Sequence, residues 1–79
     1  GNQIVFESKT DKLIDSMVLT STSTTYADKI VTAYSAVSGA TVTKTDAVVT
    51  ITFENPVSSV TAKFTASSRI ISASIYLVK

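Results

Sequence analysis

Few residues in this chain have side chains that commonly carry out chemistry. The sequence contains no histidine and no cysteine, which excludes Ser-His and Cys-His nucleophilic pairs and both imidazole and thiolate metal sites. The sequence contains neither the GxGxxG motif of dinucleotide-binding loops nor a Walker phosphate-binding loop. The acidic residues that remain are Glu7, Asp11, Asp15, Asp28, Asp46 and Glu54.

One pair of these carboxylates has a spacing that chemistry could use. Asp11 and Asp15 are four residues apart, so a helix over this stretch would place both on one face. Such a pair can perform acid–base catalysis or bind a hard cation. We interpret both as surface charges, Asp28 as a residue of a helix start and Asp46 as a turn residue. The sequence therefore predicts no catalytic residue, no metal ligand, no cofactor and no enzymatic activity.

The composition is dominated by Ser and Thr, which together make up about a third of the chain. Thr is β-branched and suits the half-exposed surface of a sheet. The formal charge of +1 gives no electrostatic reason to expect a nucleic-acid partner. No apolar run approaches the roughly 20 residues that span a bilayer. A length of 79 residues indicates a single domain over residues 1–79.

The stretch from Ala47 to Val78 predicts three consecutive strands. Apolar residues alternate with polar ones over residues 47–53, 59–65 and 70–78, which is the period of a strand with one buried face. Short polar connections, including Asn55-Pro56, separate these runs and indicate antiparallel hairpins. We therefore expect a three-stranded meander whose inner face carries Ile51, Phe64 and Ile75.

Residues 26–37 predict a helix. One apolar stripe recurs at helical spacing and consists of Tyr26, Ile30, Ala33, Tyr34 and Val37. Thr25 and Asp28 resemble a capping box at its start, and Gly39 is placed to act as the residue after its C-cap. We expect this helix to dock through Ile30, Tyr34 and Val37 on the inner face of the meander.

The remaining segments complete an α+β fold. Residues 3–7 and 41–44 predict short strands, and the Ser/Thr-rich residues 20–25 predict a flexible loop. Residues 13–19 fit both a strand and a helix, and we favour the strand. The predicted fold is a small, mainly antiparallel sheet with one α-helix, about residues 25–38, packed on one face. The alternative is an all-β sandwich in which residues 26–37 form strands.

The sheet face opposite the helix is the candidate binding surface. Tyr76 shares the outer side of the last strand with two aliphatic residues, so this side is more apolar than the outer sides of its neighbours. Either residues 1–20 cover it, or it is an interface, where tyrosine is enriched. The candidate binding residues are Thr61, Lys63, Ile70, Ser72, Ser74, Tyr76 and Val78.

These features favour a structural or protein-interaction module, for example one subunit of a surface or particle assembly. The alternative is a small module that binds a glycan or another polar ligand through a Thr/Ser-rich sheet face. We expect a protein partner or self-association and keep a glycan as a second option, with no nucleic acid and no membrane span. Gly1 in place of Met indicates a processed or tagged terminus. The compartment stays open, and we favour an extracellular or particle-surface location.

Overall fold

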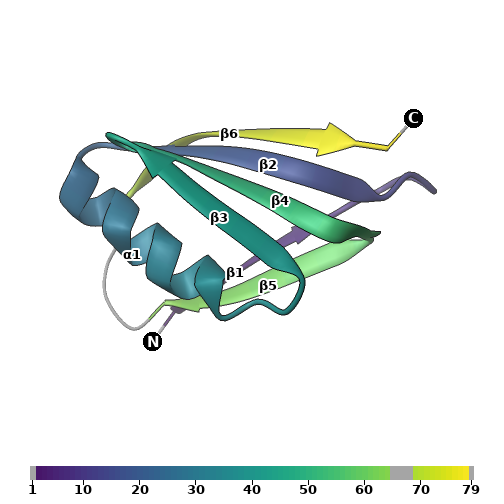
Figure 1. The fold of residues 1–79 in the computed structure, drawn as a ribbon. Helices are drawn as coiled ribbons and strands as arrows, with labels where there is room; N and C mark the ends of the chain where they lie inside the picture. Colours follow the sequence, from purple (N-terminus) through teal and green to yellow (C-terminus); the bar gives the residue numbers. More distant parts are fainter. Residues whose placement is uncertain (1, 65–68, 79) are drawn as a thin grey trace.

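The computed structural model describes residues 2–64 and 69–78 (Figure 1). These residues form one helix and six strands, which confirms the α+β class. The all-β alternative is wrong because residues 26–37 lie mostly in the helix. The elements are β1 (Asn2–Glu7), β2 (Ile14–Ser21), α1 (Thr24–Ser35), β3 (Ala40–Thr45), β4 (Val48–Val57), β5 (Ser59–Phe64) and β6 (Ile70–Leu77).

The strands form two antiparallel sheets rather than a meander. One sheet has the order β3-β4-β2-β6 and the other pairs β1 with β5. The three C-terminal strands form as expected, but β4, β5 and β6 do not pair with one another. The predicted meander is therefore wrong, because β2 lies between β4 and β6, and β1 takes β5 as its partner. The N-terminal strands join the sheets instead of covering them.

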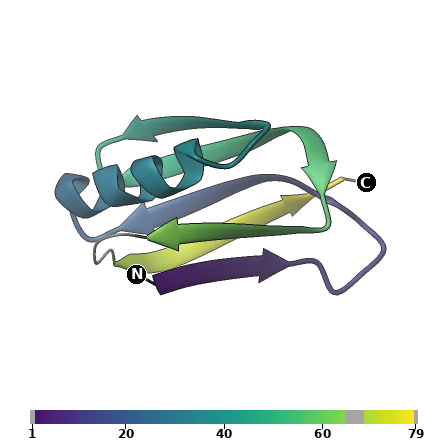
Figure 2. The same cartoon turned by 90° about the horizontal axis from the view of Figure 1, so that it is seen from below.

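The turn expected at Asn55-Pro56 is also wrong, since β4 continues to Val57. Its register against β2 jumps between the pairs Ser16–Thr52 and Ile14–Val57. Pro56 falls inside this irregular stretch, where the ladder requires no N–H from it. A bulged strand bends, and here the bend carries the chain out of the four-stranded sheet into β5, which belongs to the other sheet (Figure 2).

The helix begins earlier than expected. Its N-cap is Ser23, whose side-chain oxygen accepts a hydrogen bond of 3.3 Å from the Tyr26 N–H, so the predicted cap at Thr25 is wrong. The flexible loop over residues 20–25 is wrong as well, because its residues end β2, cap α1 and begin it. Gly39 has a φ of +81° and lies in the turn closed by the Ala40 N–H and the Val37 carbonyl oxygen, beyond the C-cap at Ala36.

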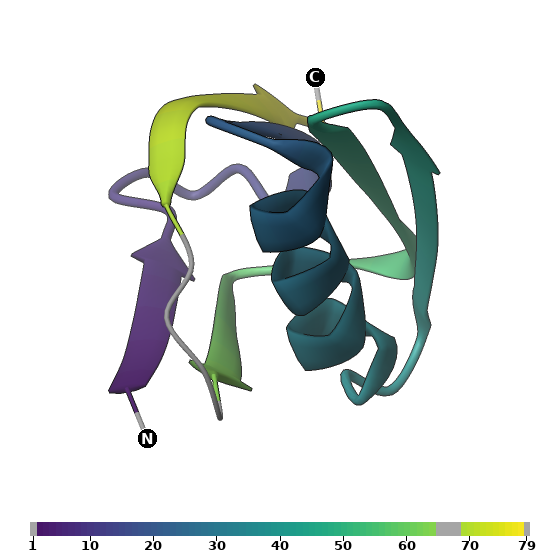
Figure 3. The same ribbon diagram turned by 90° about the vertical axis from the view of Figure 1, so that its left-hand side faces the viewer.

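The helix joins the two sheets. It packs against β3, β4 and β2 of the four-stranded sheet and against β5 of the other (Figure 3). Ile30 and Tyr34 are fully buried, which confirms that α1 docks through them, whereas Val37 is only partly buried.

The surface on which the helix lands contains Ile51 and Phe64, as expected. Ile75 is 36% exposed instead, because β6 lies at the sheet edge furthest from β3. The buried core consists of Ile14, Met17, Leu19, Ala27, Ile30, Ala33, Tyr34, Val49, Ile51, Phe53, Val60, Ala62 and Phe64.

Candidate functional site: the free edge of β6

The last strand is the most exposed apolar element of the described chain. β6 pairs with β2 along one edge, and no described strand pairs with its other edge. Ile71 is 63% exposed, Tyr76 54% and Leu77 39%. Large apolar side chains on a strand with an unpaired edge indicate an interaction surface.

The direction of the free backbone groups follows from one hydrogen bond. The Val78 N–H donates to the Leu13 carbonyl oxygen at 2.8 Å, so the backbone of Val78 faces the β2 side. Because successive residues of an antiparallel strand alternate in the direction of their backbone groups, Leu77, Ile75 and Ala73 face away from β2. These three residues form the β6 edge, where three N–H and three C=O groups are free to pair with another strand.

A groove lies beside this edge. Ile75 is opposite Met17 and Leu77 opposite Ile14 in the register, so both side chains lie on the core side of the sheet. Together with Phe6 of β1 they line a cavity of about 220 Å³. We call this the β1–β6 groove; its lining residues are Phe6, Glu7, Ser8, Lys9, Thr10, Ile14, Ile75 and Leu77.

The groove exists because the helix closes only one of the two openings between the sheets. α1 fills the opening between β3 and β5, whereas no described element lies between β1 and β6 (Figure 3). At the rim, Lys9 pairs with Glu7 at 3.0 Å, with both side chains well exposed. Such an exposed pair contributes little to stability. The groove itself is lined by the apolar side chains of Phe6, Ile14, Ile75 and Leu77, so it is an apolar surface with a polar rim.

The other strand edges carry charges that discourage pairing with a further strand. Lys44 of β3 lies on the core side opposite Val49, and its Nζ donates to Asp28 Oδ1 at 2.5 Å and to Thr24 Oγ1 at 2.9 Å. β5 carries Lys63. Inward-facing charges and edge lysines are common devices against unwanted edge pairing. β6 contains no charged residue along its whole length.

The predicted site residues do not form one surface. Ser72, Ser74 and Tyr76 lie together on the outer face of β6, in register with Thr20, Val18 and Ser16. Thr61 and Lys63 belong to the other sheet. They line a separate shallow cavity of about 320 Å³ with Ala33, Ala36 and Val37 of the helix and the segment that follows it.

Ile70 and Val78 also lie apart from Tyr76. Ile71 is an extra residue between the pairs Thr20–Ser72 and Ser21–Ile70, and this bulge places Ile70 partly buried against the core. Val78 follows β6 and lines a groove formed by Asp11, Lys12, Leu13 and Pro56. Within the described part of the expected cover, residues 2–20 leave the outer face open, since β2 pairs with β6 edge to edge and Tyr76 is more than half exposed.

A regular polar surface covers the outer side of the four-stranded sheet. The register aligns three rows across the strands, each containing at least three hydroxyl side chains. We call this the hydroxyl face; its rows are Thr41–Thr52–Ser16–Tyr76, Thr43–Thr50–Val18–Ser74 and Thr45–Val48–Thr20–Ser72. The alternating threonines at 41, 43 and 45 and at 50 and 52 signal it in the sequence, but the incorrect strand order concealed it.

Comparisons with known proteins do not assign this site. No protein-family model, no curated protein and no solved structure matches the chain. Within residues 2–64 and 69–78, no three His, Cys, Asp or Glu side chains gather into a potential metal site. The helix in this part of the chain is not long and apolar enough to cross a membrane. The function therefore has to be argued from the geometry.

Proposed function

We propose that the protein is a non-catalytic interaction module, a structural or assembly subunit, that binds an extended segment of a protein partner along the β6 edge. The observation that carries this proposal is the combination of outward-facing backbone groups at Ala73, Ile75 and Leu77 with an apolar groove beside them. Strand addition uses backbone hydrogen bonds for affinity and pockets for alternate side chains for specificity. The β6 edge supplies the backbone hydrogen bonds, and the β1–β6 groove supplies a pocket for side chains.

The geometry defines what a bound segment would look like. Its backbone would run antiparallel or parallel to β6, and every second side chain would point toward Ile75 and Leu77. Those side chains would be apolar, since Phe6 and Ile14 complete the floor. The intervening side chains would lie beside Ser74 and Tyr76 on the outer face, where polar or aromatic residues fit.

A proline substitution tests the proposal directly. Ile75→Pro removes a backbone N–H that faces away from β2, so the pairing of β6 with β2 persists. We expect the parent protein to bind a fluorescent peptide of alternating valine and threonine in an anisotropy titration, and Ile75→Pro to lose at least tenfold in affinity. Lys29→Ala, which changes an exposed residue of α1, should bind like the parent. Circular dichroism checks that both variants are folded.

The site of binding decides the outcome. Amide resonances of Ala73, Ile75 and Leu77 should shift on addition of the peptide. Shifts confined to β3 or β5, or equal affinity of the Ile75→Pro variant, would contradict the proposal.

The hydroxyl face supports a second candidate function, the binding of a glycan or another polar ligand. Its rows place Ser and Thr hydroxyls at the spacing of neighbouring strands, about 4.8 Å apart. Tyr76 adds an exposed aromatic ring at the end of one row. A titration with neutral oligosaccharides would then shift resonances of Thr43, Thr50 and Ser74, and Ile75→Pro would leave this binding intact.

A further inference from the structure

We infer that the segment bound along the β6 edge is the β6 strand of a second copy of this chain, paired antiparallel about a two-fold axis at Ile75. This inference rests on the proposed function and names its partner. It goes further in specifying the register and the residues that meet across the interface.

The register follows from the positions of the outward-facing residues. Hydrogen-bonded pairs across a two-fold axis require that each partner's outward residues face each other. With the axis at Ile75, Ile75 pairs with its own copy and Ala73 pairs with Leu77 in both directions. All three outward-facing residues of each copy then form hydrogen-bonded pairs with the other copy. If the axis is placed at Ala73, then Ile75 and Leu77 have no partner among the three outward-facing residues. If it is placed at Leu77, the same is true of Ala73 and Ile75.

The side chains agree with this register. On the core side, small Ala73 lies opposite large Leu77, and the two Ile75 side chains meet at the axis beside the β1–β6 groove. On the outer side, Ser74 lies opposite Tyr76, which is half exposed in the single chain. Pairs of this kind, large with small and aromatic with polar, avoid both overlap and empty space across neighbouring strands.

The charges also favour a second copy at this edge and disfavour one at the other edges. A two-fold axis brings each residue near its own copy, so any charge close to the axis faces a like charge. β6 has none over Ile70–Leu77, whereas β3 carries Lys44, β5 carries Lys63 and β1 carries Glu7. Like charges directly opposite each other destabilise a strand pair.

The absence of natural cysteine makes a crosslinking test specific. The register makes Ser74 and Tyr76 of the other copy a non-hydrogen-bonded pair, whose Cα atoms are about 4.5 Å apart. This separation lies within the range of a disulfide, about 4.4–6.8 Å. We expect an oxidised mixture of Ser74→Cys and Tyr76→Cys chains to form several-fold more disulfide-linked dimer than either variant oxidised alone.

Sedimentation at several concentrations supplies the second readout and needs no cysteine. The parent and Lys29→Ala, which changes an exposed residue of α1, should show concentration-dependent dimer formation, and Ile75→Pro should remain monomeric. Equal crosslinking in the mixture and in both single variants would overturn the register. A parent that stays monomeric throughout would overturn the second copy as partner. In that case, binding of the valine–threonine peptide still decides the proposed function separately.

Discussion

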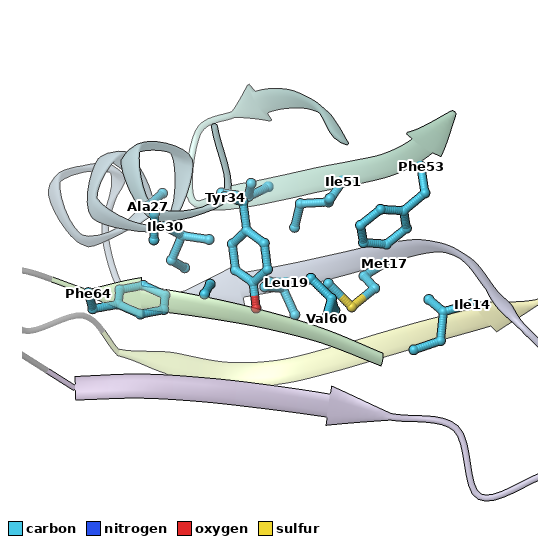
Figure 4. Packing of buried hydrophobic residues seen from close by; sticks show 13 residues of the cluster. Ile14, Met17, Leu19, Ala27, Ile30, Tyr34, Ile51, Phe53, Val60 and Phe64 are labelled. Atoms are coloured by element: carbon cyan, nitrogen blue, oxygen red, sulfur yellow. The ribbon is translucent and has the colours of Figure 1, made fainter. Parts of the chain in front are cut away.

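The rings of Tyr34 and Phe64 meet edge to face, with their centroids 6.2 Å apart and their planes at 80° (Figure 4). Tyr34 comes from α1 and Phe64 from β5, so this contact attaches the helix to the two-stranded sheet. Aromatic pairs in this geometry contribute about 0.5–1.5 kcal/mol beyond the area that they bury. The phenol hydroxyl of Tyr34 is buried and has no hydrogen-bond partner among the described residues.

Removal of that hydroxyl should not harm the protein. A buried polar group without a partner costs about 1–3 kcal/mol, and Tyr34→Phe deletes the group while keeping the ring. We expect the free energy of unfolding of Tyr34→Phe, measured with urea, to equal that of the parent or exceed it by about 1 kcal/mol. Tyr34→Ala, which empties the site, should lose about 3–5 kcal/mol. A large loss in Tyr34→Phe would mean that the hydroxyl has a partner.

Tyr34 should also make the protein less stable at high pH. Burial raises the pKa of Tyr34 from 10.0 to about 12. Between pH 10 and pH 12 the unfolded chain releases the Tyr34 proton while the folded chain keeps it, so the unfolded state is favoured as the pH rises. The free energy of unfolding is therefore unaffected by the ionisation of Tyr34 below pH 10 and falls as the pH approaches 12. The loss is about 2–3 kcal/mol. The difference between the parent and Tyr34→Phe, followed by urea unfolding from pH 8 to pH 12, isolates this effect from other titrating groups.

The start of the helix gives a matched pair of variants. Ser23 caps α1, whereas Thr25 lies inside it and is exposed. We expect Ser23→Ala to lower the free energy of unfolding by about 1 kcal/mol. Thr25→Ala should leave it unchanged or raise it slightly, since alanine is the better helix former. The reverse order in thermal or urea unfolding would restore Thr25 as the cap.

Adjacent helix residues test the docking face. Ile30 is fully buried against the sheets, while Lys29 is exposed. A charge at position 30 loses its solvation in the core, which typically costs several kcal/mol, so Ile30→Asp should unfold so small a domain. Lys29→Ala should melt like the parent. Circular dichroism on heating distinguishes the two, and normal melting of Ile30→Asp would contradict the packing of α1.

Tyr76 should behave as a surface residue in the single chain. Because its side chain is more than half exposed, Tyr76→Ala should change the stability of the monomer by no more than about 0.5 kcal/mol. Measured at a concentration below self-association, a loss of about 3–5 kcal/mol would instead identify an aromatic core site. That result would remove Tyr76 from both candidate surfaces.

The sequence was informative wherever a periodic pattern determines the local structure. The period of two in β4, β5 and β6 and the apolar stripe around Ile30 and Tyr34 predicted the elements and most of the core. Pairing was not predictable in the same way, because alternation is the same whichever strand lies beside it. The short connections suggested hairpins, and nothing in the pattern of residues 48–57 revealed that β4 bends through Pro56 into the other sheet.

The candidate site shows the same division. Alternation placed Ser72, Ser74 and Tyr76 on one face of the last strand, and the structure confirms that arrangement. The inclusion of Thr61 and Lys63 depended on the incorrect meander. The position of Ile70 depended on the bulge at Ile71, which interrupts the alternation. Alternation gives the side to which Ile75 points, but only the tertiary structure reveals that no described element covers it.

The strand order has a consequence for how the chain folds. Ile14 pairs with Leu77 in the larger sheet and Ile4 pairs with Ala62 in the smaller one, so the two sheets join segments that are 63 and 58 residues apart in the sequence, respectively. The entropy of closing such long loops is lost before the contacts that reward it have formed. Neither sheet can be completed by local steps, and β2 keeps an unpaired side until β6 arrives. The small size of this domain therefore does not make it a fast folder.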